Sequence, residues 1–75
     1  MVATVGEFIE YLEHLGFVQH KRKHGGSHIW FLVHNDGRRV KLAGERSRNL
    51  TIGLFNSLCQ QAEIDYPTAK SAIWN

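Results

Sequence analysis

The hydrophobic period of the sequence changes at Gly16, and this change limits the chain to a mixed fold of helix and sheet. Upstream of it, apolar residues recur at helical spacing: Phe8, Ile9, Leu12 and Leu15. Thr4 and Glu7 precede this stripe three residues apart, which is the spacing of a capping box. Glycine readily takes the left-handed conformation that ends many helices. The pattern therefore predicts a helix over residues 5–15.

After this glycine, three segments have the composition of β-strands. Residues 17–23 are polar and basic, residues 28–33 are β-branched and aromatic, and residues 38–42 form a shorter third segment. Gly25-Gly26-Ser27 predicts the first turn, and Asn35-Asp36-Gly37 is a strong hairpin signal before the third segment. We expect the three segments to form an antiparallel meander.

Two helical segments follow a polar loop at residues 44–49. Thr51 can cap a helix whose apolar stripe ends near Glu63, and Pro67 suits the first turn of a short terminal helix that runs through Trp74. Each helix has one apolar face to bury, so the economical arrangement places the helices on one face of the sheet. The sequence predicts an α+β fold of order α-β-β-β-α with a three-stranded antiparallel sheet.

Length and composition indicate a small globular protein. A chain of 75 residues fits one domain, and its 43% hydrophobic and 21% charged residues exclude intrinsic disorder. We expect a single domain over residues 1–75, with a core at about 5–65 and a short C-terminal extension at 66–75. The lone Cys59 excludes an intramolecular disulfide, and no apolar run approaches the roughly 20 residues of a membrane span. These features favour a cytoplasmic protein without a membrane partner.

Positive charge is concentrated in the middle of the chain. Residues 17–50 hold eight lysines and arginines against Asp36 and Glu45, for a net charge of +6, whereas the whole chain carries +2. Four of the five histidines lie in the same segment. An acidic partner is expected there, and RNA, DNA and an acidic protein are all admissible.

The register of the second hairpin decides which side chains share a face of the sheet. A two-residue turn at Asp36-Gly37 would pair Val33 with Val40 and Phe31 with Leu42 on the face toward the helices. A bulged three-residue turn would shift this register by one residue. Side chains alternate with period two, so the choice of turn determines every outward position.

With the two-residue turn, the outer face gathers a histidine, cations, an aromatic ring and a carboxylate: Lys21, Lys23, His28, Trp30, Lys41 and Glu45. His28 would lie across from Glu45, and Trp30 would offer a platform for a stacked base. Fixed cations and an aromatic ring are typical of a face that binds nucleic acid. The alternative is that the lysines protect an edge strand from aggregation and that a partner subunit covers Trp30.

Histidine is the residue type here that best suits catalysis. His20, His24 and His28 are four residues apart, about 13 Å along a strand, so they cannot share a metal ion. No metal or cofactor is expected, and Cys59 reads as a core residue. A metal-free ribonuclease needs a group with a pKa near 7 to move protons at the ribose and the leaving oxygen. His28 is the candidate for this role, and an ordinary surface histidine is the alternative.

Several segments together resemble the HicA (YcfA-like) toxins of bacterial toxin–antitoxin systems. The matching segments are Leu15-Gly16-Phe17-Val18, Gly26-Ser27-His28, Asp36-Gly37-Arg38-Arg39-Val40 and Leu58-Cys59-Gln60-Gln61-Ala62-Glu63-Ile64. The resemblance covers about residues 5–65. It departs from the family at Ala43-Gly44-Glu45, where a proline and a second histidine are usual, and at Glu63, which replaces a customary glycine.

The resemblance implies a fold similar to double-stranded RNA-binding domains and a ribosome-independent endoribonuclease that cleaves mRNA. His28 is then the catalytic histidine, and a HicB-like antitoxin is the protein partner. The two-residue-turn register, not the resemblance, makes Glu45 a candidate modulator of the His28 pKa. Candidate RNA contacts are Lys21, Lys23, Ser27, Trp30, Arg39 and Lys41. Two other functions stay open: a non-catalytic RNA-binding module of the same fold, and a structural subunit whose outer sheet face is a protein interface.

Overall fold

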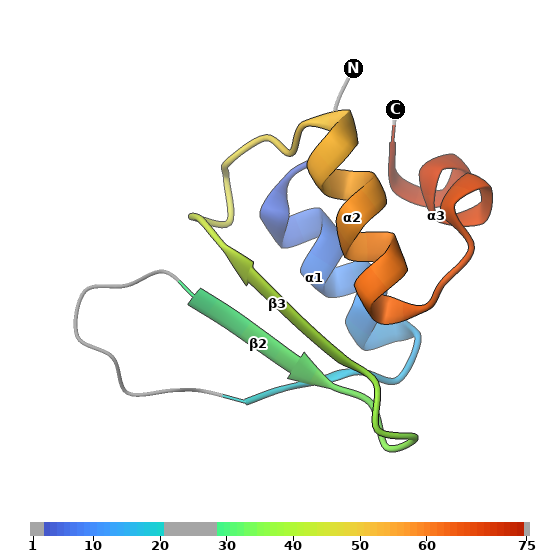
Figure 1. The fold of residues 1–75 in the computed structure, drawn as a ribbon. Coiled ribbons are helices and arrows are strands. Elements are labelled where there is room, and N and C mark those ends of the chain that lie inside the picture. Colours follow the sequence, from blue (N-terminus) through green and yellow to red (C-terminus); the bar gives the residue numbers. More distant parts are fainter. Residues whose placement is uncertain (1–2, 21–28, 75) are drawn as a thin grey trace.

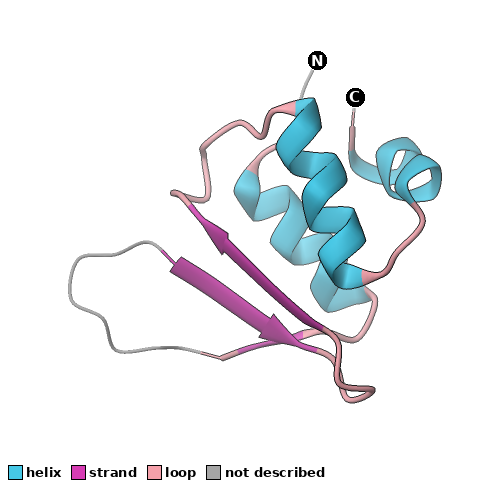
Figure 2. Ribbon diagram, viewed as in Figure 1, coloured by secondary structure: helices cyan, strands magenta, loops and turns pink. Residues whose placement is uncertain are grey.

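The computed structural model describes residues 3–20 and 29–74, and its elements follow the order α-β-β-β-α-α (Figure 1). The elements are α1 (Val5–His14), β1 (Val18–Gln19), β2 (Ile29–Val33), β3 (Arg39–Ala43), α2 (Ile52–Ala62) and α3 (Tyr66–Ile73). The strands form one antiparallel sheet in the order β1-β2-β3. All three helices lie on the same side of this sheet (Figures 1 and 2). The predicted α+β fold is confirmed, and α3 follows the α-β-β-β-α core as a further helix.

Local hydrogen bonds fix the ends of the helices. Thr4 and Glu7 form the predicted capping box, because each backbone N–H donates to the other residue's side chain, at 2.8 and 3.2 Å. Thr51 caps α2 by accepting from the Leu54 N–H at 3.1 Å. Asp65 caps α3 in the same way, and Pro67 occupies the first turn, where its missing N–H costs nothing. Short-range chemistry therefore sets where each helix begins.

Phe55 on α2 lies at the centre of the helical layer. Its ring centroid is 5.6 Å from that of Phe8, 5.7 Å from that of Tyr66 and 5.1 Å from that of Trp74. One buried side chain thus contacts both other helices and the residue that ends α3. The core beneath it is wholly apolar among the described residues and joins helices to sheet through Leu12, Leu32, Val40, Leu42 and Leu58.

The turn between β2 and β3 contains three residues, so the register based on a two-residue turn is wrong. His34 N–H donates to the carbonyl of Arg38 at 2.8 Å, and Gly37 N–H donates to the carbonyl of His34 at 2.9 Å. Gly37 has φ +98°, the left-handed conformation of a bulge that follows a tight turn. Leu32 consequently pairs with Val40. This is the alternative register, shifted by one residue.

The shift exchanges the two faces of β2. Trp30 pairs with Leu42 and packs against the core, on the same face as the fully buried Leu32. The prediction that Trp30 lies on the outer face is therefore wrong. Phe31 and Val33, expected toward the helices, instead point outward.

Glu63 ends α2 in a strained conformation. Its φ of 53° and ψ of 45° are left-handed, and it is the sole non-glycine residue with positive φ in the described chain. The side chain of an L-residue disfavours this region by about 1–2 kcal/mol, which glycine avoids. We expect Glu63→Gly to raise the free energy of unfolding by about 1 kcal/mol and the melting temperature by about 4–8 °C.

Thermal unfolding followed by circular dichroism measures this effect. Glu63→Ala is the matched control, because it removes the carboxylate but keeps the Cβ that causes the strain. Equal melting temperatures for the glycine and alanine variants would show that backbone strain is not the cause.

Candidate functional site

Three side chains form a row across the centre of the outer face of the sheet. The row consists of His20 just after β1, Phe31 in the centre of β2, and Lys41 on β3. His20 N–H donates to the Phe31 carbonyl at 2.7 Å, and their ring centroids are 6.4 Å apart. Phe31 pairs directly with Lys41 in the β2–β3 register. An imidazole, an aromatic ring and an ammonium group are thus neighbours on one surface.

Apolar and basic side chains border this row. A second row contains Val18, Val33 and Arg39, and a third contains Ile29 and Ala43. Val18 is 60% exposed and Ile29 is 39% exposed. None of the three helices covers this side of the sheet (Figure 1). Within the described residues, the outer face is therefore an open surface with an apolar centre.

The outer face is also positively charged. Arg39 and Lys41 are exposed, and neither forms a salt bridge with another described residue. The outward positions of β1, β2 and β3 include no aspartate or glutamate. A cation without a local carboxylate partner remains available to an anionic ligand. Arg39 and Lys41 are predicted RNA contacts that the fold brings together.

The remaining predicted site residues lie either outside the described residues or elsewhere in the fold. Lys21, Lys23, Ser27 and His28 lie outside the described residues. Glu45 follows β3 in a turn closed by a hydrogen bond from Arg48 N–H to its carbonyl at 2.9 Å. The register that placed Glu45 opposite His28 is off by one residue, and their coupling stays a prediction.

Trp30 holds the turn after β3 rather than offering a platform on the outer face. Its indole Nε1–H donates to the carbonyl of Gly44 at 2.7 Å, and the Arg46 guanidinium lies 5.4 Å from its ring centroid. Arg46 also contacts the Glu10 carboxylate at 3.4 Å. The half-buried ring therefore ties β2 to this turn and, through Arg46, to α1, because a buried indole N–H needs a hydrogen-bond partner.

A second cluster of titratable residues lies at the hairpin and has a structural role. Asp36 accepts hydrogen bonds from the backbone N–H and the guanidinium of Arg38, and these contacts lower its pKa. His34 lies 3.1 Å from the Asp36 carboxylate, and its Nε2 is 3.2 Å from the carbonyl of Leu15. Arg38 also donates to the Ala62 carbonyl at the end of α2. The hydrogen bonds of His34, Asp36 and Arg38 thus join the hairpin to α2 and to the residue that follows α1.

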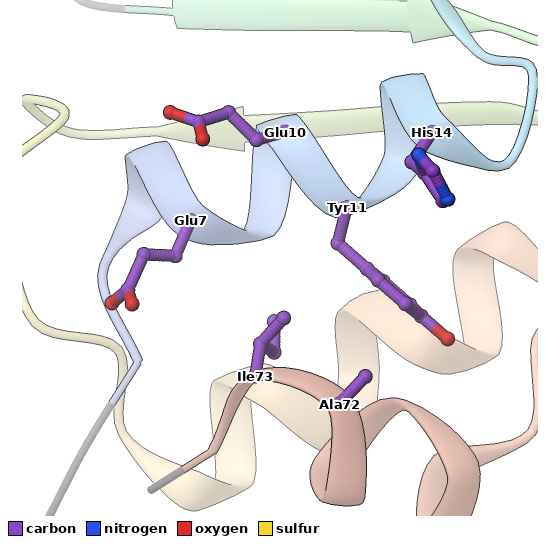
Figure 3. Close-up of a pocket in the computed structure, with 6 residues that line it drawn as sticks. All are labelled: Glu7, Glu10, Tyr11, His14, Ala72 and Ile73. Carbon is purple, nitrogen blue, oxygen red and sulfur yellow. The ribbon is translucent and has the colours of Figure 1, made fainter.

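A hollow of about 340 Å³ lies between α1 and α3, on the helical side of the molecule (Figure 3). It is lined by Glu7, Glu10, Tyr11, His14, Ala72 and Ile73. Tyr11 points from α1 toward α3, and Glu7 and Glu10 extend from the same helix as Tyr11 (Figure 3). Two carboxylates repel phosphate, and Glu7 already serves the capping box. The hollow is therefore a poor candidate for RNA.

The thiol and the possible metal ligands offer little catalytic chemistry in residues 3–20 and 29–74. Burial raises the pKa of Cys59 to about 11, with a smaller contribution from the Asp65 charge. The thiol thus stays protonated at neutral pH. No three histidine, cysteine, aspartate or glutamate side chains in these ranges are grouped to hold a metal ion. None of the described helices combines the length and apolar composition of a membrane span.

Sequence reasoning missed Phe31 and His20 as members of the candidate site. The available signal was the three-residue length of Asn35-Asp36-Gly37, since only the bulged turn turns Phe31 outward. His20 faces Phe31 through the pairing of β1 with β2, a register that the turn between β2 and β3 does not set.

Comparison with known proteins adds the family to this geometry. No curated protein matches the chain. The family model for the HicA toxin of bacterial toxin–antitoxin systems matches residues 5–64, from the first residue of α1 to just beyond α2. Because this match spans most of the 75 residues, the chain belongs to the HicA family and is a toxin whose partner is an antitoxin.

Proposed function

We propose that this toxin is a ribosome-independent endoribonuclease that cleaves mRNA. The observation that supports it best is the open sheet face with Arg39 and Lys41 exposed and no carboxylate at its described outward positions. His28 directly precedes Ile29, the first residue of β2, in the sequence. Cations in β3 suit phosphate binding, and histidine suits proton transfer at phosphate esters.

The proposed reaction needs only proton transfer and charge stabilisation. The ribose 2′-oxygen loses its proton and bonds to phosphorus, while the bond from phosphorus to the 5′-oxygen breaks and that oxygen gains a proton. The products are a 2′,3′-cyclic phosphate and a 5′-hydroxyl end. His28 acts as the general acid or base, and nearby cations stabilise the charge on the phosphate. Glu45 is proposed to tune the His28 pKa.

The proposed RNA contacts follow the same division of roles. Arg39 and Lys41 bind phosphates, and the sequence adds Lys21, Lys23 and Ser27 before β2. Trp30 contributes indirectly, because its hydrogen bond to Gly44 holds the turn that follows β3. A HicB-like antitoxin is the proposed protein partner, and the cytoplasm, where mRNA occurs, is the proposed location.

RNA affinity should depend on salt through the two β3 cations. Each neutralised phosphate of a single strand contributes about −0.7 to the slope of log affinity against log salt. Replacing Arg39 and Lys41 together with glutamine should therefore reduce the slope by about 1.4. Fluorescence anisotropy with a 2′-O-methyl oligonucleotide measures binding without cleavage.

The control for this experiment is Lys70→Gln. Lys70 lies on α3, on the helical side of the molecule, and its replacement removes one positive charge, as Lys41→Gln does. The control should leave the slope unchanged. Equal slopes for the double variant and the unaltered protein would show that RNA binds elsewhere.

A cleavage assay tests the enzymatic proposal itself. Purified toxin, incubated with end-labelled RNA in the presence of EDTA, should produce fragments with 2′,3′-cyclic phosphate and 5′-hydroxyl ends. Binding without cleavage would favour the alternative function, a non-catalytic RNA-binding module. The specific reason for this alternative is that Glu45 stands where the family usually has a second histidine. Absence of both binding and cleavage would favour the outer face as a protein interface.

A further inference from the structure

Phe31 provides the aromatic ring at the centre of the outer face. The proposed phosphate contacts of Arg39 and Lys41 assign no role to this ring. Phe31 is half-buried, pairs with Lys41 on one side and bonds to His20 on the other. The two rings are tilted by 70°, so the His20 imidazole is not stacked parallel on Phe31. Aromatic residues on a sheet beside cations are a common means of binding unpaired bases.

We propose that Phe31 is a stacking platform for one unpaired base of single-stranded RNA, with the adjoining phosphates bound by Lys41 and Arg39. The inference rests on the proposed function and specifies the form of RNA that the outer face accepts. It replaces Trp30 as the base platform, since the register places the indole on the opposite face of β2.

The spacing on β3 fits an extended strand of RNA. Arg39 and Lys41 are two residues apart on one face, so their Cα atoms are separated by about 6.7 Å along the strand. This spacing allows them to contact successive phosphates while a base turns toward the paired Phe31. A duplex keeps its bases paired and stacked inside, so it cannot present one to the ring. The surface therefore fits a single strand better than a double helix.

Charge distinguishes RNA from a protein as the occupant. The exposed Val18 and Ile29 are compatible with either partner, but Arg39 and Lys41 flank the apolar centre without a carboxylate on the described face. A polyanion neutralises both cations along its length, and its bases supply flat apolar surfaces between them. This combination favours a nucleic-acid strand.

The test uses an uncleavable 2′-O-methyl oligonucleotide that carries one fluorescent 2-aminopurine base, moved through the sequence one position at a time. At one position, binding should quench the fluorescence, because the base stacks on Phe31. Phe31→Leu should weaken affinity about ten- to a hundredfold and abolish that quenching. Phe31→Trp should keep both, because it keeps an aromatic ring.

Val33→Ala is the matched control, since Val33 is a half-buried, outward residue of the same strand. This variant should change RNA affinity by no more than about twofold and leave the quenching intact, because the valine side chain that it shortens has no π-face for a base to stack on. Thermal unfolding of every variant confirms that it is folded. Phe31→Tyr provides a second ring-retaining variant if Phe31→Trp is destabilised.

Two results would overturn the inference. One is equal affinity of Phe31→Leu and the unaltered protein for the single strand. The other is an equal loss of affinity for a blunt RNA duplex, which would exclude base stacking. The first result together with loss of antitoxin binding by Phe31→Leu would identify the face as a protein interface.

The binding measurement separates this inference from the proposed catalysis, because the oligonucleotide cannot be cut. Phe31-dependent binding without cleavage of ordinary RNA would support the inference and refute the nuclease. Cleavage that persists in Phe31→Leu with unchanged affinity would support the nuclease and refute the stacking platform.

Discussion

Replacing His28 with alanine should lower the rate of RNA cleavage by about a hundred- to ten-thousandfold, the usual contribution of a general acid or base. RNA affinity should change by no more than about twofold, since the proposed phosphate contacts are the cations of β3 and the basic residues that precede β2 in the sequence. Single-turnover cleavage with excess toxin measures the chemical step, and anisotropy on an uncleavable oligonucleotide measures binding. Replacing a catalytic residue lowers the cleavage rate and leaves the binding affinity unchanged.

His14→Ala is the matched control, because His14 is exposed at the end of α1 on the helical side. It should cleave RNA as fast as the unaltered protein. In cells, toxin expression should arrest growth, and His28→Ala should relieve the arrest while His14→Ala does not. Undiminished cleavage by His28→Ala would refute the assignment of the catalytic histidine.

Signals that act within a few residues were enough to predict the helices. Thr4 and Glu7 specify a capping box because both partners lie within one turn, and Asp65 with Pro67 specifies the start of α3 for the same reason. Such signals depend on short-range hydrogen bonds and on fixed backbone geometry. Packing elsewhere in the chain has little influence on them.

The register of β2 and β3 could not be fixed in this way. Residues Ile29 to Val33 are all apolar, so either set of alternating side chains can be buried, and no polar residue marks the outer face. On β3, by contrast, Val40 and Leu42 alternate with charged residues and identify the inner face at once. The turn decided between the registers, and the Asp-Gly pair fits both a two-residue and a bulged three-residue turn.

This single ambiguity explains the error at the candidate site. Lys41 was assigned correctly to the outer face because its own strand alternates, and Arg39, a candidate RNA contact, lies on the same face. Trp30 and Phe31 exchanged faces because their strand does not alternate. The polarity of β3 thus identified its outward side chains, whereas the choice of the outward aromatic residue on β2 depended on a turn geometry that tertiary packing selects.

Phe55→Ala should lower the free energy of unfolding by about 3–5 kcal/mol, the usual cost of removing a buried aromatic ring. A chain of 75 residues is stable by roughly 4–11 kcal/mol in total, at about 0.05–0.15 kcal/mol per residue. The variant therefore loses a large share of its stability, and its melting temperature should fall by about 12 °C or more. Chemical and thermal denaturation measure both quantities.

Leu54→Ala is the neighbouring control, because Leu54 is 41% exposed on the same helix and alanine favours helix. Its stability should stay within about 1 kcal/mol of the unaltered protein. Trp74→Ala removes only the partner ring 5.1 Å from Phe55, so it should cost less than Phe55→Ala. Equal losses at positions 54 and 55 would contradict the central place of Phe55 in the core.

Activity distinguishes this effect from that of His28. Phe55 lies in the helical layer, where its ring contacts Phe8, Tyr66 and Trp74, whereas the row of Phe31 lies on the opposite side of the sheet (Figure 1). At a temperature where Phe55→Ala is still folded, its cleavage rate per folded molecule should match that of the unaltered protein. Cleavage should then be lost along the unfolding curve as the variant is warmed, whereas His28→Ala should show its slower cleavage at every temperature at which it is folded.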